Sequence, residues 1–400
     1  FTWHHDSGAA YWDESAAYAF TLDQIERDIE APTAELHALC LDLVEEAVQS
    51  ERLMEQLDIP EASRDYVADS WKRGDPSLYG RFDFAYDGVS PAKLYEYNAD
   101  TPTSVYESAV FQWLWLEERI ASGDLPAGAD QFNSLHEQLI DRFRAIFPGG
   151  GFVHFASDPD FVEDRQTVRF LEDLARQAGL DPQFVAIGDI GLNADGRFVD
   201  HENWLIGALF KLYPWEDMLR DDYARPLPDA QVTVLEPAWK AILSNKALLP
   251  LLWERHAGHP NLLASWFDDD PAASALGASY VRKPLFSREG ANVEFTLDGS
   301  PFTALNGGPQ FTFTQGISIA VICDDQRQVD EYWDKFVAAG GTPVACGWIT
   351  DHFGVSWQID PKILIDLIAD PDPTKAAKAM QAMMGMVKID AEQIRLATTK

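Results

Sequence analysis

Hydrophobic residues recur with a helical period near the start of the chain. Six apolar residues follow one another at alternating intervals of three and one positions: Leu36, Leu39, Cys40, Leu43, Val44 and Ala47. This spacing places them on one face of an α-helix. Thr21 followed three positions later by Gln24 is a capping box, so we predict a helix over residues 21–57. Cys40 lies within the apolar stripe, which indicates a core residue rather than a nucleophile.

The pattern changes to alternating apolar and polar positions in RFDFAYDGVSPAKLYEYNADTPTS, residues 81–104. A period of two is typical of strands, and the Asp-Gly pair in this stretch predicts a turn between two of them. Arg81 and Asp83 then share one face of the first strand, and Glu96 and Asn98 share one face of the second. We therefore predict a β-hairpin with an arginine, two carboxylates and a carboxamide on its polar side. Cross-strand ion pairs on a surface hairpin are the alternative explanation.

Expected helices and strands alternate through the rest of the first three quarters of the chain, which is the pattern of an α/β protein. The expected helices cover residues 104–121, 131–146, 163–178 and 236–257. The expected strands are GFVHFAS, QFVAIGDI, a segment near 205–212, and SYVRKPL. The first of these helices is rich in Trp and Leu and has little polar face, so we expect it to be buried.

The order of expected elements changes from about residue 296. EFTLDGSPFTALNGG and TQGISIAVIC are typical of strands, and CGWITDHFGVSWQID is typical of a hairpin. DQRQVDEYWDKFVAAGG predicts a helix that ends at a glycine pair, and DPDPTKAAKAMQAMMGM predicts a helix that begins at a proline. We predict a βαββ-like arrangement here and a domain boundary near residues 293–297, although no linker composition marks it.

The composition is ordinary for a soluble globular protein, with 46% hydrophobic and 24% charged residues. No apolar run reaches the ~20 residues that a membrane span needs, so we expect no membrane partner. The three cysteines, Cys40, Cys323 and Cys346, lie far apart and show no CxxC spacing. Their spacing argues against a disulfide framework or a zinc site and favours a cytoplasmic location.

The net charge of −34 is unevenly distributed. Residues 297–400 hold 8 Lys and Arg against 13 Asp and Glu, so their net charge is −5, and residues 1–296 carry the other −29. Such acidity disfavours nucleic acid as a partner, because its binding needs basic surface. It suits a cationic small molecule, although solubility alone also explains it.

The polar face of the predicted hairpin has the donor atoms that Mg²⁺ prefers. Asp83, Glu96 and Asn98 supply hard oxygen ligands, whereas zinc would favour His or Cys, and neither lies nearby in the sequence. Arg81 beside them could neutralise charge that develops on a phosphoryl or acyl-phosphate group. We expect the three oxygen donors to lie within about 6 Å of a common point.

Two lysines stand in apolar surroundings. Lys246 opens an apolar segment in ILSNKALLPLLW, and Lys283 interrupts an apolar strand in YVRKPL. A lysine in such a place is costly to bury unless an anion such as a nucleotide phosphate meets it. A lysine that reaches out to solvent at a sheet edge is the alternative. The loop SREGANV could close over phosphates through its backbone N–H groups, although it is not a Walker loop.

Four motifs stand in an order and spacing that carry a family resemblance: GRFDFAYDG, LYEYNADTPTS, EPAWKAILSNKALLPLLWE and YVRKPLFSREGANVE. With YWDESAAYAFT, FVHFASDPDFVEDRQTV and FKLYPWEDM, they resemble the glutathionylspermidine synthase family of ATP-grasp ligases from about Tyr11 to Glu294. The resemblance implies ATP and Mg²⁺ as cofactors and a carboxylate that is activated as an acyl phosphate and captured by an amine. It implies a thiol peptide like glutathione and a polyamine or other amine as substrates.

The resemblance also implies roles for individual residues. They are Asp83, Glu96 and Asn98 as magnesium ligands, Arg81 over the transferred phosphoryl group, Lys246 and Lys283 at the nucleotide, Arg288 in the loop that closes on the reaction, Thr101 and Thr103 at the thiol peptide, and Glu163 and Asp164 facing the amine. The family's separate cysteine amidase domain has no counterpart here, which resembles the synthetase-only branch.

The strands and the glycine-rich segment that complete the family's nucleotide site are not found after the closing loop. Instead, FTLDGSPFTALNGGPQFTFTQGISIAVICDDQRQVDEYWDKF through CGWITDHFGVSWQIDPKIL resembles the vicinal oxygen chelate superfamily, in its demethylubiquinone methyltransferase-like branch. We therefore expect an α/β (α+β) protein. An ATP-grasp-like region over residues 1–295, incomplete at its C-terminal end, would be joined to a βαβββ-type module over residues 296–400. A natural fusion, an artefactual joining and a deliberate chimera all fit.

ATP- and Mg²⁺-dependent ligation of a peptide carboxylate to an amine is the favoured function. Two alternatives stay open: a catalytically impaired hybrid that binds nucleotide weakly, and a ligand- or metal-binding activity of the vicinal oxygen chelate type. His352 is the only histidine in the last quarter, and one histidine with scattered acids is more typical of a turn than of a metal site. Exposed sheet edges in two incomplete parts would favour self-association.

Overall fold

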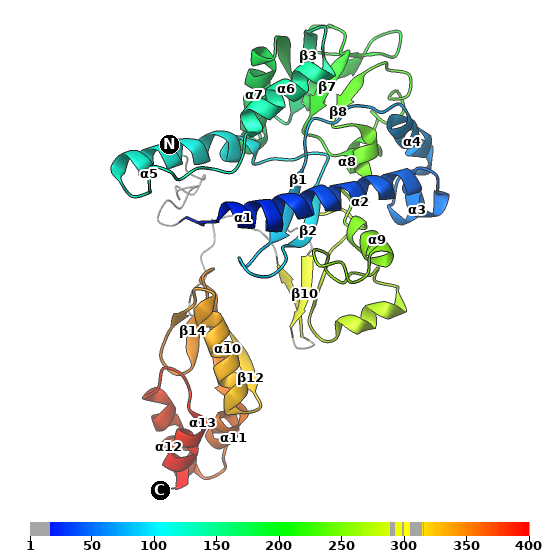
Figure 1. Ribbon diagram of the computed structural model, residues 1–400. Coiled ribbons are helices and arrows are strands. Elements are labelled where there is room, and N and C mark those ends of the chain that lie inside the picture. The colour runs from blue at the N-terminus through cyan, green and yellow to red at the C-terminus, as the bar shows by residue number, and fades with distance from the viewer. Residues whose placement is uncertain (1–16, 289–292, 298–299, 305–313, 315, 400) are drawn as a thin grey trace. The chain divides into compact units, whose positions relative to one another are not determined.

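The structure, a computed structural model, describes residues 17–288, 293–297, 300–304, 314 and 316–399. The chain divides into two compact units: the first holds the described residues up to 304, and the second holds those from 314 onward (Figure 1). None of the helices in these described ranges has the length and apolar character needed to cross a membrane.

A helical rod opens the first unit. It is formed by α1 (Leu22–Gln24), a π-helical segment (Ile25–Glu30) and α2 (Ala31–Ala47). The predicted capping box is present, because Gln24 N donates to Thr21 Oγ1 (3.2 Å) and Thr21 N donates to Gln24 Oε1 (2.9 Å). All but one of the predicted stripe residues are buried, and Leu39 is partly buried. Cys40 is among the buried ones, so its predicted place in the core is confirmed.

The prediction of one helix up to residue 57 is wrong. A turn follows α2, and α3 (Glu51–Gln56) begins as a new helix. The side chain of Ser50 accepts a hydrogen bond from Leu53 N (3.3 Å), so Ser50 caps the new helix. A serine at this position stabilises a helix start more than it stabilises the interior of a continuous helix. A short 3₁₀ turn (Glu61–Ser63) and α4 (Arg64–Lys72) then lead toward the hairpin.

The predicted hairpin is formed by β1 (Arg81–Ala85) and β2 (Lys93–Asn98), which pair antiparallel. In Figure 1 the rod of α1 and α2 passes across this hairpin. Ring contacts confirm the packing, because His37 of α2 lies 6.0 Å from Tyr97 and 6.5 Å from Phe82 between ring centroids. The rod therefore covers one face of the hairpin.

A four-stranded parallel sheet forms the other half of the first unit. Its order is β4-β3-β7-β8, and its strands are β3 (Gly151–Ser157), β4 (Leu180–Ala186), β7 (Ala208–Lys211) and β8 (Thr233–Leu235). The helices α6 (Leu135–Ile146) and α7 (Val162–Gln177) cover one face through a core that includes Phe143, Phe155, Leu171 and Phe210. The short helix α8 (Trp215–Met218) belongs to a second core, which receives Ala156, Leu209 and Val234 from the sheet. This parallel sheet confirms the predicted α/β class.

Two further helix predictions differ from the structure. The segment 104–121 forms a π-helical turn (Glu107–Phe111) and α5 (Gln112–Ser122), which buries only Leu116 and leaves Trp113 40% exposed. The predicted burial of this helix is therefore wrong, because its Trp residues do not form a continuous apolar face.

The predicted helix at 236–257 is also wrong. It consists of a 3₁₀ turn (Ala238–Ala241) and the shorter helix α9 (Leu248–Arg255). Between them the side chain of Asn245 accepts a hydrogen bond from Ala247 N (2.8 Å). Such a local side-chain bond competes with helical hydrogen bonding and ends the first turn.

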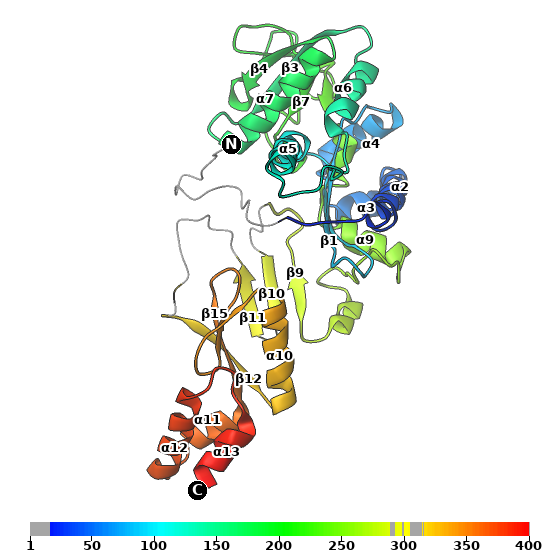
Figure 2. The same ribbon diagram turned by 60° about the vertical axis from the view of Figure 1, so that its left-hand side comes forward.

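Smaller elements complete the first unit. They are the 3₁₀ turns Ile187–Asp189 and Pro271–Leu276 and the short paired strands β5 (Gly191–Leu192) and β6 (Phe198–Val199). A three-stranded antiparallel sheet of order β11-β10-β9 contains β9 (Tyr280–Arg282), β10 (Val293–Leu297) and β11 (Ser300–Ala304), side by side in Figure 2. The predicted domain boundary at residues 295/296 falls within β10.

The second unit has the element order β-α-β-β-β, which has one short strand more than the βαββ-like arrangement predicted from the residue pattern. These elements are β12 (Ser318–Cys323), α10 (Gln326–Ala338), β13 (Thr342–Pro343), β14 (Trp348–Thr350) and β15 (Ser356–Pro361). The sheet order is β12-β15-β14-β13, with β12 and β15 parallel and the other pairs antiparallel. Three helices follow: α11 (Lys362–Ile368), α12 (Pro373–Met384) and α13 (Ala391–Thr399).

The α10 helix shows how the sequence sets its ends. Asp325 caps its start by accepting from Gln328 N (2.9 Å), and the helix stops before the pair Gly340–Gly341, as predicted. Its buried residues Val329 and Trp333 pack with Cys323, Ile349 and Ile359 of the sheet.

Candidate functional site

The two faces of the hairpin differ in chemistry. One face packs on the rod, where Phe82 lies over Tyr97 with ring centroids 4.1 Å apart and Leu94 is fully buried. The other face carries the predicted polar side chains. In the strand register Arg81 lies opposite Asn98, and Asp83 lies opposite Glu96. Because directly opposite residues share a face, the sequence correctly placed these four groups on one side of the sheet.

A β-bulge explains which residues of β2 face the core and which face the polar side. Asp83 pairs with Glu96, but the next residue, Phe84, pairs with Leu94, so Tyr95 is an extra residue without an opposite partner. A bulge of this kind shifts the alternation of side chains by one position. Leu94 and Tyr97 can therefore both face the core although they are three positions apart.

Hydrogen bonds join the polar groups into one cluster. Arg81 donates from Nε and Nη2 to the two carboxylate oxygens of Asp83 (2.7 and 3.1 Å). Asn98 Nδ2 donates to Asp83 Oδ2 (3.2 Å) and to Glu96 Oε1 (3.0 Å). The three residues predicted as metal ligands therefore converge, although their role as ligands stays a prediction.

The two predicted lysines reach the same cluster from distant parts of the sequence. Lys246 Nζ forms an ion pair with Glu96 Oε2 (2.6 Å). Lys283 Nζ donates to the carbonyl oxygen of Tyr95 in the bulge (3.3 Å) and lies 5.7 Å from the centre of its ring. Burial lowers the pKa of Lys283, the negative charge of Glu96 counteracts this, and the positive charge of Lys246 lowers it further.

The cluster has an excess of positive charge. It contains the carboxylates of Asp83 and Glu96 and the cations of Arg81, Lys246 and Lys283. Burial by itself raises the pKa of Glu96, but the hydrogen bonds and charges supplied by Lys246, Asn98 and Lys283 lower it to about 2. Glu96 is therefore ionised at neutral pH. An anion such as a phosphate group would balance the remaining positive charge.

The donor atoms on this face fit Mg²⁺ when a phosphate shares the ion. Two carboxylates and one amide are hard oxygen donors, and half a turn of the Asn98 amide group would present its oxygen to the same point. Within the described ranges, no group of three or more His, Cys, Asp or Glu could hold a metal ion. Mg²⁺ would therefore need further oxygens from phosphate or water, which is its usual coordination in phosphoryl-transfer sites.

Three further predicted residues lie near the hairpin. Arg81 Nη1 donates to the carbonyl oxygen (3.2 Å) and the hydroxyl oxygen (3.3 Å) of Thr103. Thr101 accepts a short hydrogen bond from Arg288, and Arg288 also donates to Glu216 Oε1 from Nη2 (2.8 Å) and Nε (3.1 Å). Thr103 is therefore adjacent to the cluster, and Thr101 is joined to the loop residue Arg288.

The predicted amine-facing residues lie on a different element. Glu163 and Asp164 occupy the first turn of α7. Burial is the main reason that the pKa of Tyr79 is raised, and the negative charge of Asp164 contributes to it. Asp164 is thus close enough to act electrostatically on Tyr79, which lies in the segment that leads into β1.

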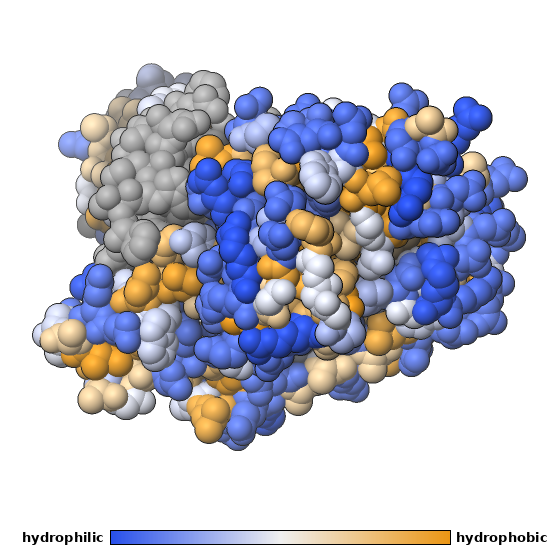
Figure 3. All heavy atoms as spheres, turned by 90° about the horizontal axis from the view of Figure 1, so that it is seen from above, coloured by the Kyte–Doolittle hydropathy of each residue, from blue (hydrophilic) through white to orange (hydrophobic). Residues whose placement is uncertain are grey.

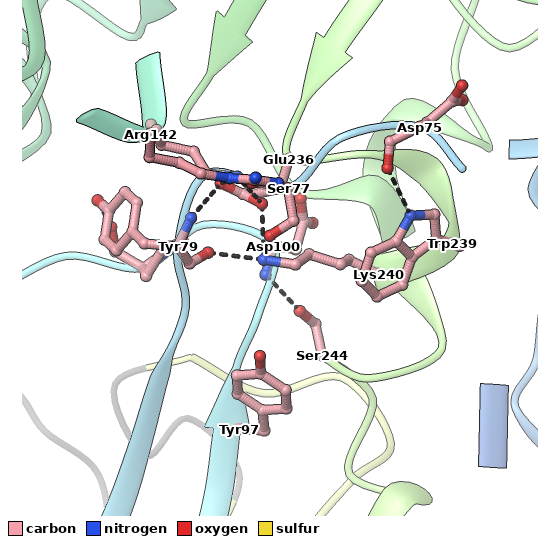
Figure 4. Close-up of polar contacts among 12 residues, drawn as sticks. Asp75, Ser77, Tyr79, Tyr97, Asp100, Arg142, Glu236, Trp239, Lys240 and Ser244 are labelled. Atoms are coloured by element: carbon pink, nitrogen blue, oxygen red, sulfur yellow. Dashed lines mark hydrogen bonds and ion pairs between the residues drawn. The ribbon is translucent and has the colours of Figure 1, made fainter. Parts of the chain in front are cut away.

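The sequence analysis missed two buried ion pairs. Asp100 pairs with Lys211, and Glu236 pairs with Lys240, and all four side chains are at most 1% exposed. Figure 4 shows the second of these pairs. A signal was present, because Lys211 interrupts the apolar stretch ALFKLY in the same way that Lys283 interrupts its strand. A Glu and a Lys four positions apart, in EPAWK, were a second signal.

The face of the molecule seen in Figure 3 is largely polar. In the view of Figure 3, hydrophilic side chains cover much of the visible face, and hydrophobic ones lie in smaller patches between them. This surface agrees with the strongly negative net charge of the chain.

Comparison with known proteins assigns a family. Residues 1–322 match the family model described as glutathionylspermidine synthase preATP-grasp. A Haemophilus influenzae protein named "Putative acid--amine ligase" is 40% identical over 321 residues, which cover 77% of this chain and 80% of that protein. The match to the family model extends beyond residue 294, where the resemblance was predicted to end, and stops at residue 322 within β12.

Two longer relatives are also similar. Trypanothione synthetase of Crithidia fasciculata is 27% identical over 298 residues, which cover 68% of this chain and 45% of that protein. The bifunctional glutathionylspermidine synthetase/amidase of Escherichia coli is 27% identical over 306 residues, covering 69% and 47%. The chain therefore spans a little less than half the length of these two relatives.

Proposed function

Because the chain belongs to the glutathionylspermidine synthase preATP-grasp family, we propose that it is an ATP- and Mg²⁺-dependent ligase that joins a carboxylate to an amine. The proposed substrates are a thiol peptide like glutathione and a polyamine or other amine. One observation supports this most directly: two carboxylates, a carboxamide, an arginine and two lysines meet on one face of the hairpin.

The polar face can divide the work of phosphoryl transfer between its residues. Asp83, Glu96 and Asn98 would hold Mg²⁺, which supplies charge neutralisation at the phosphate oxygens. Lys246 and Lys283 would bind the nucleotide phosphates. Arg81 would stabilise the charge on the transferred phosphoryl group, since its planar fork can make two parallel hydrogen bonds.

The proposed reaction has two steps. First, a carboxylate oxygen of the acid substrate forms a bond to the γ-phosphorus of ATP while the bond to ADP breaks. The ammonium group of the amine substrate then loses one proton to solvent, and its nitrogen bonds to the carbonyl carbon of the acyl phosphate. Phosphate leaves with its electron pair, and the nitrogen loses a second proton to solvent. Thr101 and Thr103 would contact the acid substrate, Arg288 would lie in the loop that closes over it, and Glu163 and Asp164 would attract the positively charged amine.

The test measures ADP release and amide product together. Glutathione and spermidine are the first substrates to try, with the product identified by mass spectrometry. We expect Arg81→Lys and Lys283→Ala each to lower kcat on the order of a hundredfold, because each removes a donor from the developing charge. Lys93→Ala is the matched control, since Lys93 lies on β2 but donates to the carbonyls of Pro260 (2.5 Å) and Leu262 (3.3 Å).

This assay, together with calorimetry of Mg-ATP binding, separates the proposed ligase from the alternative of a catalytically impaired hybrid. An impaired hybrid would bind Mg-ATP weakly in calorimetry and form no amide with any acid and amine pair. Coupled product formation that is insensitive to Arg81→Lys would instead place the phosphoryl site elsewhere and contradict the roles proposed here.

For the second unit we propose a module of the vicinal oxygen chelate type. Its β-α-β-β-β order and the strand order β12-β15-β14-β13 support this. His352 lies exposed in the turn between β14 and β15, with its ring 3.7 Å from the ring of Phe353, which favours a turn role over a metal ligand. Titration with divalent cations, monitored at His352 by NMR, would test a metal role.

A further inference from the structure

Two buried ion pairs lie where the chain enters and leaves the hairpin, and Figure 4 shows the one at the entry. Lys240 Nζ lies 2.6 Å from Glu236 Oε2, and Lys211 Nζ lies 2.8 Å from Asp100 Oδ1. Charged groups at such depth are costly unless each is paired and hydrogen-bonded, and both conditions are met here.

The first pair holds the segment that leads into β1. The carboxylate of Glu236 accepts hydrogen bonds from the backbone N–H groups of Leu78 (3.0 Å) and Tyr79 (2.9 Å). Lys240 Nζ donates to the carbonyl oxygen of Tyr79 (2.6 Å). Glu236 and Lys240 therefore hold both the N–H and the C=O group of Tyr79, which lies two residues before Arg81.

Neighbouring residues hold the preceding part of the same segment. Trp239 Nε1 donates to the carbonyl oxygen of Asp75 (3.1 Å), and Arg142 Nε donates to that of Ser77 (2.7 Å) (Figure 4). The entry to the hairpin is thus attached at several consecutive residues.

The second pair holds the segment that leaves β2. Asp100 lies two residues after Asn98, and its carboxylate accepts from Lys211 Nζ (2.8 Å) and from Trp215 N (2.6 Å). The backbone N–H of Asp100 donates to Ser244 Oγ (2.8 Å). The exit of the hairpin is therefore fixed through both its side chain and its backbone.

Both pairs start from the same edge of the parallel sheet. Lys211 is the last residue of β7, and Glu236 directly follows β8, the neighbouring strand. The negative charge of Asp100 also acts on Lys240, so the two pairs are close enough to interact. The hairpin is connected at both ends to one rigid edge.

A role in stability alone does not explain these pairs. Apolar side chains of similar volume would generally stabilise a buried position as well as an ion pair does. Apolar side chains could not, however, hold backbone N–H and C=O groups in fixed directions. The geometry accordingly favours orientation of the hairpin as the reason for charge at these four positions.

We propose that Glu236–Lys240 and Asp100–Lys211 are positioning pairs that keep Arg81 and Asn98 in register for phosphoryl transfer. This inference rests on the proposed function of the hairpin face. The pairs act through the two ends of the hairpin.

The test uses double variants that remove charge but keep volume and one acceptor oxygen. They are Glu236→Gln with Lys240→Met, and Asp100→Asn with Lys211→Met. The matched control is Arg165→Met with Glu172→Gln, which removes a largely buried pair (2.9 Å) within α7. Ser244→Ala is a milder variant that removes only the acceptor for Asp100 N, and it serves if a double variant does not fold.

Two measurements read the outcome in the full chain. Hydrogen–deuterium exchange reports the mobility of residues 78–100, and ADP release reports kcat for each variant with and without Arg81→Lys. We expect faster exchange over residues 78–100 in the hairpin variants, whereas the control should change exchange only around α7. We expect kcat to fall by roughly ten- to a hundredfold, as misplacement of about 1 Å can cause.

Comparing each double variant with and without Arg81→Lys separates loss of positioning from a general loss of structure. If the pairs act through Arg81, their removal should cost much less once Arg81 is already replaced, since effects that pass through one residue are not additive. Unchanged exchange over residues 78–100, or an equal fold-loss in both backgrounds, would overturn the inference. If the parent releases no ADP with any acid and amine, the proposed function fails, and the exchange data alone decide whether the pairs position the hairpin.

Discussion

Buried carboxylates occur in both units, but their surroundings differ. In the first unit, Asp100 and Glu236 each face a buried lysine at 2.8 and 2.6 Å. In the second unit, Asp360 of β15 is 5% exposed, and no described residue forms an ion pair with it. Burial raises the pKa of Asp360 to about 6.

The difference shows what each buried charge can do. A charge that is paired and hydrogen-bonded stays ionised and can orient its neighbours, whereas an unpaired one tends to become neutral. The paired charges of the first unit stand at the two ends of the hairpin that carries the polar face. We expect the carboxyl of Asp360, which has no ion-pair partner among the described residues, to lower the stability of the second unit at neutral pH.

The largest expected effect on stability comes from leaving a buried charge of the first unit without its ion-pair partner, as Asp360 is in the second unit. Glu236→Ala leaves Lys240 buried without its carboxylate and removes the acceptor for two backbone N–H groups. We expect the free energy of unfolding to fall by about 3–5 kcal/mol. Urea unfolding followed by circular dichroism measures it.

An exposed ion pair is the control for this change. Glu51 pairs with Arg64 at 2.8 Å, but its side chain is largely exposed. Glu51→Ala should therefore cost about 0–1 kcal/mol. Equal losses for Glu51→Ala and Glu236→Ala would show that burial does not distinguish the two pairs.

The next effect comes from removing the unpaired carboxyl of the second unit. Asp360→Asn should raise the free energy of unfolding of this unit by about 1–3 kcal/mol at pH 7. The folded pKa of about 6 lies above the ordinary value of 3.8. The charged carboxylate therefore does not destabilise the unit below pH 3.8. Its destabilising effect grows between pH 3.8 and about 6 and is complete above about pH 6.

The pH dependence tests this explanation. The advantage of Asp360→Asn should disappear as the pH falls to about 4, because the native carboxyl is then protonated when folded. Hydrogen exchange of peptides from β12 and β15 measures the stability of this unit. Asp366→Asn, at an exposed position of α11, is the control. An advantage that persists at pH 4 would contradict the assignment.

The sequence predicted the polar face of the hairpin well because alternation is a local property. Arg81, Asp83, Glu96 and Asn98 could be placed on one side by counting positions in two short strands. The bulge at Tyr95 could not be predicted, since an extra residue is visible only when the opposite strand is known. Cys40 was predictable for the same local reason, and burial raises the pKa of its thiol to about 12.

Long-range packing explains what the sequence did not predict. Asp100 and Lys211 are 111 positions apart, so only the fold brings them together. The segment 236–257 contains enough Leu and Ala to predict a helix, but the side-chain bond of Asn245 divides it. The metal and nucleotide roles of the hairpin residues stay predictions, because geometry alone does not identify a ligand.

A smaller effect concerns the half-buried carboxylate of the hairpin face. The folded pKa of Glu96 is about 2, below the ordinary 4.5. Its contribution to stability is therefore present above about pH 4.5 and is lost as the pH falls toward 2. Glu96→Gln should lower the stability of the hairpin at pH 7 by less than about 1 kcal/mol, because solvent screens the pair with Lys246.

Exchange of the hairpin amides at pH 7 and pH 3 measures this contribution. The difference in stability between the parent and Glu96→Gln should narrow at the lower pH, as it should for Asp360→Asn. The sign of the effect at pH 7 is opposite, because Glu96→Gln is less stable than the parent and Asp360→Asn is more stable. A difference that widens on acidification would mean that Glu96 is not held as a carboxylate by its cationic neighbours.

The smallest expected effect is a shift in the pH profile at Lys283. Burial lowers the pKa of Lys283, so this cation loses its charge at a lower pH than an ordinary lysine does. The kcat/KM for Mg-ATP, which reports the free enzyme, should therefore decline on the alkaline side as Lys283 deprotonates.

Lys283→Arg keeps its charge over the whole accessible range, so its alkaline decline should begin at a higher pH, although the larger side chain lowers the overall value. Lys93→Arg, on the same hairpin but bonded to the carbonyls of Pro260 and Leu262, should leave the profile unchanged. An identical alkaline limb in the parent and Lys283→Arg would mean that another group titrates there, and that Lys283 does not supply the charge that meets the phosphate.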